Sequence, residues 1–271
     1  MPELVRELPS SSNSAAIDLW LIATDTVETT VLESLQNALS ADEQAQLQRR
    51  RLPAAQRSFV LSRGCLRHLL SRYAAQAPSG LRFTYGPRGK PELGPSGSSP
   101  TPACPALIFN LSHSGAWLLV GVSVTPGVRA IGVDLEQLRC LKQLSGLCHR
   151  CLTPAEAETV LALTHPQSDH RFLRYWTGKE ACLKALGLGI ADSMQTLELK
   201  LAPAELALAL VPTVVATDWP NWPQHPGRLY QWQPTAGHVA AIAVQSHIHQ
   251  TFTFQLRQTT PAALAEKNSG Y

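Results

Sequence analysis

The chain has 271 residues, of which 44% are hydrophobic and 16% charged, and its net charge is +3. This composition is typical of a globular protein, and so mild a charge gives no indication of a nucleic-acid partner, which requires a clustered basic surface. The first residues lack the basic and apolar regions of a signal peptide, and no apolar run reaches the ~18 residues of a membrane span. We therefore expect a cytoplasmic protein without a membrane partner.

The first half of the chain alternates strand and helix signals. Residues 1–14 are rich in serine and are expected to be flexible. Ser40 and Glu43 form a capping box that opens one helix. Pro53 suits the first turn of a second helix, whose apolar residues recur at helical spacing to about Ala77. The predicted strands of this half are residues 17–23, 81–85, 107–111 and 117–124.

A Pro–Gly turn at 125–127 leads into a second half with the same order of elements. Thr153 and Glu156 form another capping box. A long helix is predicted over residues 169–186, and Gly187 ends it. The predicted strands of this half are residues 130–135, 196–201, 229–232, 239–244 and 251–256.

The repeated order of strand, helices and strands favours an α+β fold. We expect two similar halves, 15–126 and 127–257, packed around a central cleft, because an order of elements that occurs twice is typical of duplication. Residues 258–271 are polar and are expected to form a flexible tail.

Two clusters of charged residues indicate a site for an anion and a metal. Asp134 and Glu136 lie two positions apart on a predicted strand, so their side chains share a face. Glu180 and Lys184 are neighbours on one side of the long helix. Each pair alone is ordinarily surface charge. Together, three carboxylates without His or Cys form a hard-oxygen site that favours Mg²⁺ or Mn²⁺, and magnesium usually completes its coordination with water and phosphate.

Lys179 and the pair of Cys148 and Cys151 each permit two interpretations. Lys179 falls within the apolar stripe of the helix, where it either extends outward along its aliphatic stem or pairs with a buried acceptor. Cys148 and Cys151 form a CxxC motif, which permits a zinc or redox interpretation. Because the sequence has no second CxxC or histidine pair at zinc spacing, reduced cysteines in a helical segment are the favoured interpretation.

Two further motifs, in the first half, indicate phosphate binding. The turn that contains Lys90 and Pro91 presents a cation, although ordinary basic turns have the same composition. The segment 109–115 carries hydroxyl groups and an imidazole after a strand, and its backbone N–H groups and His113 could hold a phosphate. Ser112 and His113 are poorly placed as a nucleophile and base, because adjacent strand residues point to opposite faces.

The four motifs, in this order, resemble the 4′-phosphopantetheinyl transferases, specifically their Sfp-type branch. The resemblance covers roughly residues 17 to 250. Each motif alone is weak, but the four with compatible spacing are specific. The matching segments are Gly89-Lys90-Pro91, Phe109-Asn110-Leu111-Ser112-His113-Ser114, Gly132-Val133-Asp134-Leu135-Glu136, and the helical segment that contains Trp176, Lys179, Glu180, Lys184 and Ala185.

The resemblance implies a role for each matching residue. Asp134, Glu136 and Glu180 would hold Mg²⁺ against the pyrophosphate of coenzyme A, and Lys184 would contact that pyrophosphate. Lys90, Ser112 and His113 would lie at the adenosine end, with His113 at the 3′-phosphate. Arg57 and Ser58 would match the family's Arg-Thr pair that touches the nucleotide, with Ser in place of Thr. The implied coenzyme-binding residues are Arg57, Ser58, Lys90, Pro91, Ser112, His113 and Lys184, while Arg50 and Arg51 are candidates for basic residues that some relatives carry upstream.

The resemblance also implies a reaction and its partners. The serine hydroxyl of an apo carrier protein would attack the β-phosphate of coenzyme A, phosphopantetheine would be transferred, and 3′,5′-ADP would leave. Glu180 is the implied base, and Lys184 would stabilise charge on the pyrophosphate. The expected partners are acidic acyl, peptidyl or aryl carrier proteins, and the enzyme is expected to be a monomer.

Two alternatives use the same residues. A magnesium-dependent nucleotide or phosphoester hydrolase would release ADP from coenzyme A without a carrier protein. A non-catalytic carrier-binding module would be expected to lack a carboxylate or a lysine of the site, whereas this chain retains Asp134, Glu136, Glu180 and Lys184.

Overall fold

The computed structural model describes residues 14–94, 107–188, 194–201, 212–216, 227–246 and 251–266. These residues form two four-stranded sheets, a two-stranded hairpin and the helices that cover them, which confirms the predicted α+β class. The strands are β1 (Ser14–Ala23), β2 (Phe83–Tyr85), β3 (Pro91–Leu93), β4 (Ile108–Ser114), β5 (Trp117–Ser123), β6 (Val128–Gln137), β7 (Thr213–Ala216), β8 (Gly227–Trp232), β9 (His238–Ser246) and β10 (Thr251–Thr259). The α-helices are α1 (Thr29–Asn37), α2 (Ala41–Gln48), α3 (Pro53–Ala74), α4 (Leu144–Cys151), α5 (Pro154–Leu161), α6 (Gln167–Leu186) and α7 (Pro261–Glu266).

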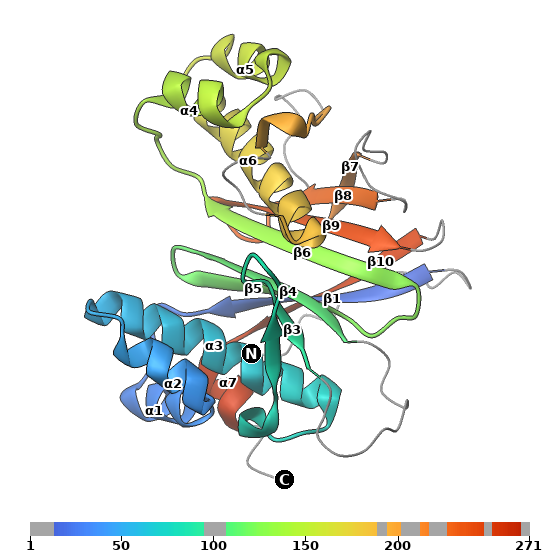
Figure 1. Cartoon of the computed structure of the whole chain (residues 1–271). Coiled ribbons are helices and arrows are strands. Elements are labelled where there is room, and N and C mark those ends of the chain that lie inside the picture. The colour runs from blue at the N-terminus through green and yellow to red at the C-terminus, as the bar shows by residue number, and fades with distance from the viewer. Residues whose placement is uncertain are drawn as a thin grey trace.

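The first sheet has the strand order β10-β1-β5-β4, and α1, α2, α3 and α7 lie on its outer side (Figure 1). The long helix α3 contributes Leu66, Leu69 and Leu70 to the core beneath this sheet, and all three side chains are fully buried. The predicted helix that starts at Pro53 is confirmed, and it ends where Ala75 adopts a left-handed conformation, two residues before the predicted end.

The second sheet has the order β6-β9-β8-β7, and α6 lies on its outer face (Figure 1). Alternate residues of β6 point inward, where Ile131, Val133 and Leu135 join the core between the two sheets. The other face of β6 meets α6 at Gly132. A Cβ atom there would lie 1.9 Å from the carbonyl oxygen of Ala181, so only glycine lets the helix lie directly on the strand.

Local sequence signals placed the helix ends well. Ser40 with Glu43 and Thr153 with Glu156 form the predicted capping boxes of α2 and α5, each with reciprocal bonds between side chain and backbone. The helix predicted over 169–186 is α6, and Gly187 ends it in the left-handed region with φ of 69°. These signals succeed because a capping group satisfies backbone donors or acceptors that the helix itself leaves unpaired.

Three predictions about the second half are wrong. Residues 196–201 do not form a strand: although Leu197, Leu199 and Leu201 are buried at alternate positions, the Leu199 N–H bonds to a carboxylate oxygen of Glu156 instead of a strand. The boundary at 257 is wrong because β10 pairs in parallel with β1 and completes the sheet of the first half.

The prediction that residues from 258 onward form a flexible tail is also wrong for the part that the structure describes. Residues 258–259 end β10, and α7 follows. Leu264 of α7 is fully buried, and Arg72 of α3 donates hydrogen bonds to the carbonyls of Ala263 and Leu264. Residues 1–13 and 267–271, also predicted to be flexible, lie outside the described residues. No helix in the described part is both long and apolar enough to cross a membrane.

Candidate functional site

One edge of β6 pairs with β9, and the opposite edge is held by side chains of β4. The backbone N–H of Val133 donates to Asn110 Oδ1 at 2.9 Å, and the N–H of Gln137 donates to Ser114 Oγ at 3.0 Å. Asn110 and Ser114 share a face of β4 with Ser112, because strand residues two apart point the same way. The predicted motif after Phe109 therefore fastens the first sheet to the edge of the second.

Lys90 and Lys184 also donate hydrogen bonds to backbone carbonyls of β6. The Lys90 ammonium group donates to the backbone carbonyls of Ile131 (3.3 Å) and Ala185 (3.1 Å). Burial lowers the pKa of Lys90 to about 8, because water no longer solvates its charge, and Glu92 opposes this change only in part. Lys90 thus joins the hairpin β2–β3 to both β6 and the end of α6.

Lys184 lies at the centre of the predicted site. Its ammonium group donates to Val133 O at 3.2 Å, to Asp134 Oδ1 at 2.7 Å and to Ser112 Oγ at 3.1 Å. Ser112 in turn donates to the same Asp134 oxygen at 2.8 Å. The structure therefore brings together a lysine of α6, a carboxylate of β6 and a hydroxyl of β4, as the sequence motifs predicted for the first two.

The carboxyl groups of Asp134 and Glu180 are both buried, with exposed fractions of 4% and 3%. Burial raises the pKa of Asp134, although Lys184 and Ser112 act against it. The pKa of Glu180 rises to about 7, first because of burial and then because of the negative charge of Asp134. One oxygen of each group, Asp134 Oδ2 and Glu180 Oε1, is buried without a hydrogen-bond partner.

Glu136 is placed differently from the other two carboxylates. It is partly exposed, and its Oε2 atom accepts hydrogen bonds from Arg139 at 2.7 Å and from Ser114 at 3.3 Å. Its charge nevertheless raises the pKa of both Asp134 and Glu180. Glu136 is therefore electrostatically coupled to the pair while its oxygen is engaged by Arg139.

This donor set fits a divalent cation of the magnesium class. All three groups offer carboxylate oxygens, the ligands that hard cations prefer. The two unpartnered buried oxygens are ready to act as ligands, and a cation between them would offset the burial and repulsion that raise both pKa values. Asp134, Glu136 and Glu180 would hold such an ion.

A cavity of about 350 Å³ lies on the other side of β4, between that strand and α3. Arg57, Ser58 and His113 all line it, so the structure brings together three of the predicted coenzyme-binding residues. Ser112 does not take part, because its hydroxyl points toward Asp134 and Lys184. Lys90 is also elsewhere, bound to the backbone of β6 and α6. The other residues of the cavity wall are Thr24, Asp25, Ala54, Leu61, Ser62, Gly115, Ala116 and Leu118.

Other arginines of the basic segment 49–63 stack on aromatic rings. The Arg50 guanidinium lies 4.3 Å from the centroid of the Phe59 ring, and Arg63 lies over both Phe59 and Tyr85. Buried nitrogens of Arg50 and Arg63 have no hydrogen-bond partner. Arg57 therefore lines the cavity, whereas Arg50 and Arg63 pack on Phe59.

Lys179 is part of the internal structure of the second half. Its side chain is fully buried, and its ammonium group lies 2.5 Å from Glu156 Oε2. It also donates to the carbonyls of Cys151 and Met194. Burial lowers its pKa, while Glu156 acts in the opposite direction. Of the two alternatives that the sequence left open for Lys179, the structure shows pairing with a buried acceptor, which is the capping glutamate of α5.

Sequence reasoning missed several residues of the site. Asn110 and Ser114 lie within a predicted motif, and their spacing with Ser112 indicates that all three side chains share a face, but this pattern does not reveal their bonds to β6. Arg139 follows the strand that carries Glu136 and offered no local signal of the pairing. Cys148 and Cys151 are buried in α4, in the helical segment that the favoured interpretation predicted.

Comparisons with known proteins identify relatives of one transferase family. A profile of the 4′-phosphopantetheinyl transferase superfamily matches residues 130–243, which include all of α6 and all but the first two residues of β6. The 4′-phosphopantetheinyl transferase HetI of Nostoc sp. is 38% identical over 231 residues, which cover 85% of this chain and 88% of the relative. The 4′-phosphopantetheinyl transferase Sfp of Bacillus subtilis is 26% identical over 136 residues, 50% of this chain and 54% of the relative.

A solved structure is also similar over part of the chain. It is a holo-(acyl-carrier-protein) synthase from Bacillus anthracis in complex with CoA (3′,5′-ADP), 20% identical, which matches 45% of this chain and 99% of its own with a TM-score of 0.36. The family assignment does not depend on this partial match. The extended identity to HetI shows that the chain belongs to the 4′-phosphopantetheinyl transferase superfamily, and it is an enzyme of this transferase class.

Proposed function

We propose that the protein is an Sfp-type enzyme that transfers 4′-phosphopantetheine from coenzyme A to a serine of an apo carrier protein, with Mg²⁺ as cofactor. The observation that carries this proposal is the group formed by the buried carboxylates of Asp134 and Glu180 and the partly exposed Lys184. It combines two unpartnered carboxylate oxygens with an ammonium group on one side of α6. Such a group suits a pyrophosphate held by a divalent cation.

Glu180 is the proposed proton acceptor. Without a bound cation its pKa is about 7, and a cation would lower this value, so the ionised carboxylate can receive the proton of the attacking serine, directly or through a water. The serine oxygen of the carrier forms a bond to the β-phosphorus of coenzyme A while the bond from that phosphorus to 3′,5′-ADP breaks. The serine proton passes to Glu180. A bound divalent cation supplies charge neutralisation at the pyrophosphate, together with Lys184 and Lys90.

The cavity beside α3 is the proposed site of the nucleotide end of coenzyme A. Arg57 supplies a guanidinium group for phosphate, and His113 and Ser58 add further donors. His113 and Ser112 are consecutive on β4 but face opposite sides. A coenzyme that extends past the end of this strand would therefore reach the cavity with its adenosine and the carboxylate group with its pyrophosphate.

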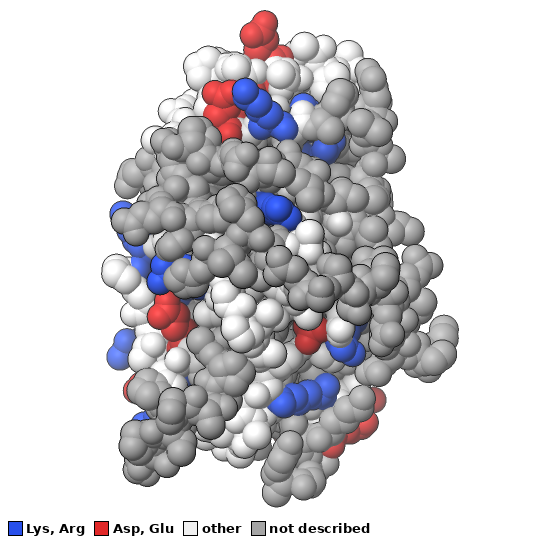
Figure 2. All heavy atoms as spheres, turned by 90° about the vertical axis from the view of Figure 1, so that its right-hand side faces the viewer, with Lys and Arg blue, Asp and Glu red and all other residues white. Residues whose placement is uncertain are grey.

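Acidic carrier proteins are the proposed partners, because the chain is mildly basic with a net charge of +3. Charged residues of both signs are interspersed among the described residues of the face in Figure 2. Charge on that face therefore gives no reason to place the carrier there. That the enzyme works as a monomer in the cytoplasm stays a prediction.

A loading assay tests the proposal. The full chain is incubated with labelled coenzyme A, Mg²⁺ and a panel of apo carrier proteins, and transfer of label to the carrier is measured. Asp134→Ala and Glu180→Ala should each reduce loading by on the order of 10² to 10³ or more. Glu158→Ala changes an exposed glutamate of α5 and serves as the matched control. Near-wild-type loading by either site variant would rule out the proposed site.

Two comparisons separate the remaining possibilities. Release of ADP from coenzyme A and Mg²⁺ without any carrier would favour a hydrolase. His113→Ala should weaken the use of coenzyme A and affect dephospho-coenzyme A much less, because only the former carries a 3′-phosphate. An equal loss with both donors would argue against the nucleotide site.

A further inference from the structure

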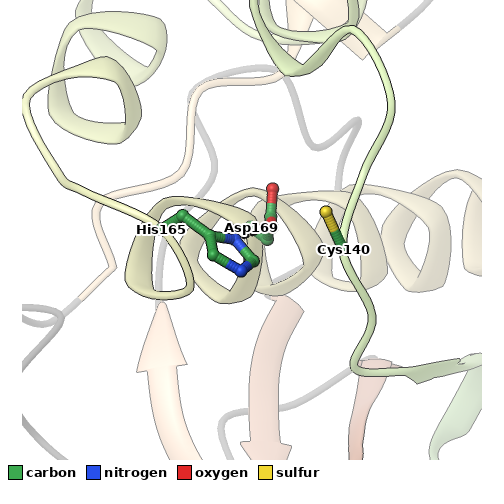
Figure 3. A group of neighbouring side chains, drawn as sticks. All are labelled: Cys140, His165 and Asp169. Atoms are coloured by element: carbon green, nitrogen blue, oxygen red, sulfur yellow. Dashed lines mark hydrogen bonds and ion pairs between the residues drawn. The ribbon is translucent and has the colours of Figure 1, made fainter.

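A second group of metal-ligating side chains lies at the other end of α6. Figure 3 shows Cys140 on the coil that follows β6, His165 just before α6, and Asp169 in the first turn of that helix. One ligand atom of each residue lies within 4.8 Å of the others, and these residues form the one such trio found among the described His, Cys, Asp and Glu residues. We propose that this trio binds a divalent ion of the zinc class.

The geometry is close to that of a bound ion. Tetrahedral zinc places sulfur, nitrogen and oxygen ligands roughly 3.3–3.8 Å from one another, given bond lengths of about 2.0–2.3 Å. His165 Nδ1 and Asp169 Oδ2 are 2.7 Å apart in a hydrogen bond, so the two groups would give up that bond and move apart by about 0.6 Å to share an ion. Cys140 lies on coil outside the sheet and is exposed, and its sulfur lies within 4.8 Å of both other ligand atoms, so it has only a short distance to move to the ion.

The chemistry of the three donors selects the ion. A thiolate, an imidazole and a carboxylate form a mixed set that suits zinc and its neighbours, whereas magnesium prefers oxygen ligands alone. An ionised Cys140 and Asp169 would together balance the two positive charges of the ion. Arg139, the cation next to Cys140 in the chain, is already paired with Glu136.

Burial favours Asp169 as the fixed ligand. Its side chain is only 4% exposed, while that of His165 is 63% exposed. A carboxylate held in the first turn of α6 has little freedom, so it would define the position of the ion, and the exposed Cys140 and His165 would adjust to it. Three protein ligands leave a fourth position open to water or to a donor from outside the chain.

The trio is distinct from the carboxylate group of the transferase site. Asp169 and Glu180 are 11 residues apart on one helix, which corresponds to about 17 Å along its axis. An ion at the trio would tie the connection between β6 and α4 to the start of α6. We therefore expect a structural ion that stabilises this part of the fold without taking part in transfer.

Cobalt titration tests this site, because a tetrahedral cobalt ion with a thiolate ligand absorbs strongly in the near-ultraviolet and visible ranges. The full chain is freed of metal with a chelator and titrated with Co²⁺ and then Zn²⁺ under saturating Mg²⁺, which occupies hard-oxygen sites. We expect about one equivalent of cobalt with a thiolate charge-transfer band, displaced by zinc. Cys140→Ser should remove this band and weaken binding by on the order of 100-fold, and His165→Ala should weaken binding similarly.

Matched variants make the result decisive. Cys104→Ser changes a cysteine that lies outside the described residues, and Asp134→Ala disables the carboxylate group; both should keep the band. Zinc should raise the melting temperature of the wild-type chain and of these two controls but not that of Cys140→Ser. Because Cys140 is exposed, its replacement should not disturb folding, so misfolding would not account for the lost response to zinc. A band that survives in Cys140→Ser, or its absence from the wild-type chain at micromolar protein, would overturn the proposal.

Discussion

Replacement of Glu180 by glutamine should stabilise the metal-free protein while it inactivates the enzyme. Glu180 is 3% exposed, and its pKa rises from the ordinary value of 4.5 to about 7, first through burial and then through Asp134. The ionised form is therefore unfavourable in the fold. Glutamine has nearly the same shape but carries no charge, so Glu180→Gln removes this cost.

The sign and size of the effect follow from proton linkage. Between pH 4.5 and 7 the folded protein keeps a proton on Glu180 that the unfolded chain has released, so the free energy of unfolding decreases as the pH rises through this window. Each unit of pKa corresponds to 1.36 kcal/mol, and the full cost above pH 7 is on the order of 3 kcal/mol. The stability contribution is thus intact below pH 4.5 and lost above pH 7.

Urea unfolding of wild-type and Glu180→Gln protein in a chelating buffer measures this cost. The two proteins should have similar stability near pH 4.5, and the variant should be more stable by about 1–3 kcal/mol at pH 8, or roughly 2–12 °C in melting temperature. Mg²⁺ should narrow the gap, because it binds the wild-type site better and so stabilises that protein more. Glu158→Gln, on the exposed face of α5, should show no such dependence. A gap of the same size at pH 5 and pH 8, or a variant that is less stable at pH 8, would refute the reasoning.

Lys90 gives a prediction about the pH dependence of coenzyme binding, and Lys179 gives one about stability. Since burial lowers the pKa of Lys90 to about 8, affinity for coenzyme A should fall as pH rises above 8, by up to about tenfold between pH 8 and 9, while Lys90→Arg should keep its charge and a flat profile in calorimetric titration. A flat wild-type profile would argue against phosphate contact by Lys90. Lys179→Met should cost about 3–5 kcal/mol in urea unfolding, because it leaves the Glu156 carboxylate buried without its cation. Loss of carrier loading by folded Lys179→Met with unchanged stability would instead place Lys179 in the active site.

The sequence was sufficient to predict the parts of the site that depend on one element at a time. The spacing of Asp134 and Glu136 predicted a shared face of a strand, and that of Glu180 and Lys184 a shared side of a helix. Both predictions rest on backbone periods that hold in any fold. The contact of Asp134 with Lys184 then follows once α6 lies on β6, a packing that Gly132 permits.

Contacts that depend on how two elements pack against each other could not be predicted from local sequence patterns. Ser112 and His113 were assigned together to the nucleotide end, but β4 runs beside the free edge of β6, so Ser112 turns to Asp134 while His113 turns to the cavity. The acceptor of Lys179 could not be predicted for a similar reason. The capping box accounts for Glu156 by itself, but its Oε2 atom both accepts the Thr153 N–H of the cap and pairs with Lys179.

The donor count at the edge of β6 distinguishes the two lysines of the proposed coenzyme site. An ammonium group has three N–H donors. Lys90 uses two of them on the carbonyls of Ile131 and Ala185, so one is left for a phosphate without any rearrangement. Lys184 already makes three contacts, with Ser112, Val133 and Asp134, and it can reach a pyrophosphate only by giving one up.

The contact that Lys184 can release most readily is the one to Asp134. A divalent cation attracts this carboxylate more strongly than a single ammonium group does, so binding of the cation would free one Lys184 donor at the same moment that it brings the pyrophosphate within reach. The ion pair of 2.7 Å therefore neutralises a buried carboxylate that a divalent cation would otherwise have to neutralise. Asp134 would pass from Lys184 to Mg²⁺, and Lys184 would pass from Asp134 to the pyrophosphate. Binding of Mg²⁺ should therefore increase the affinity for coenzyme A, and binding of coenzyme A should increase the affinity for Mg²⁺.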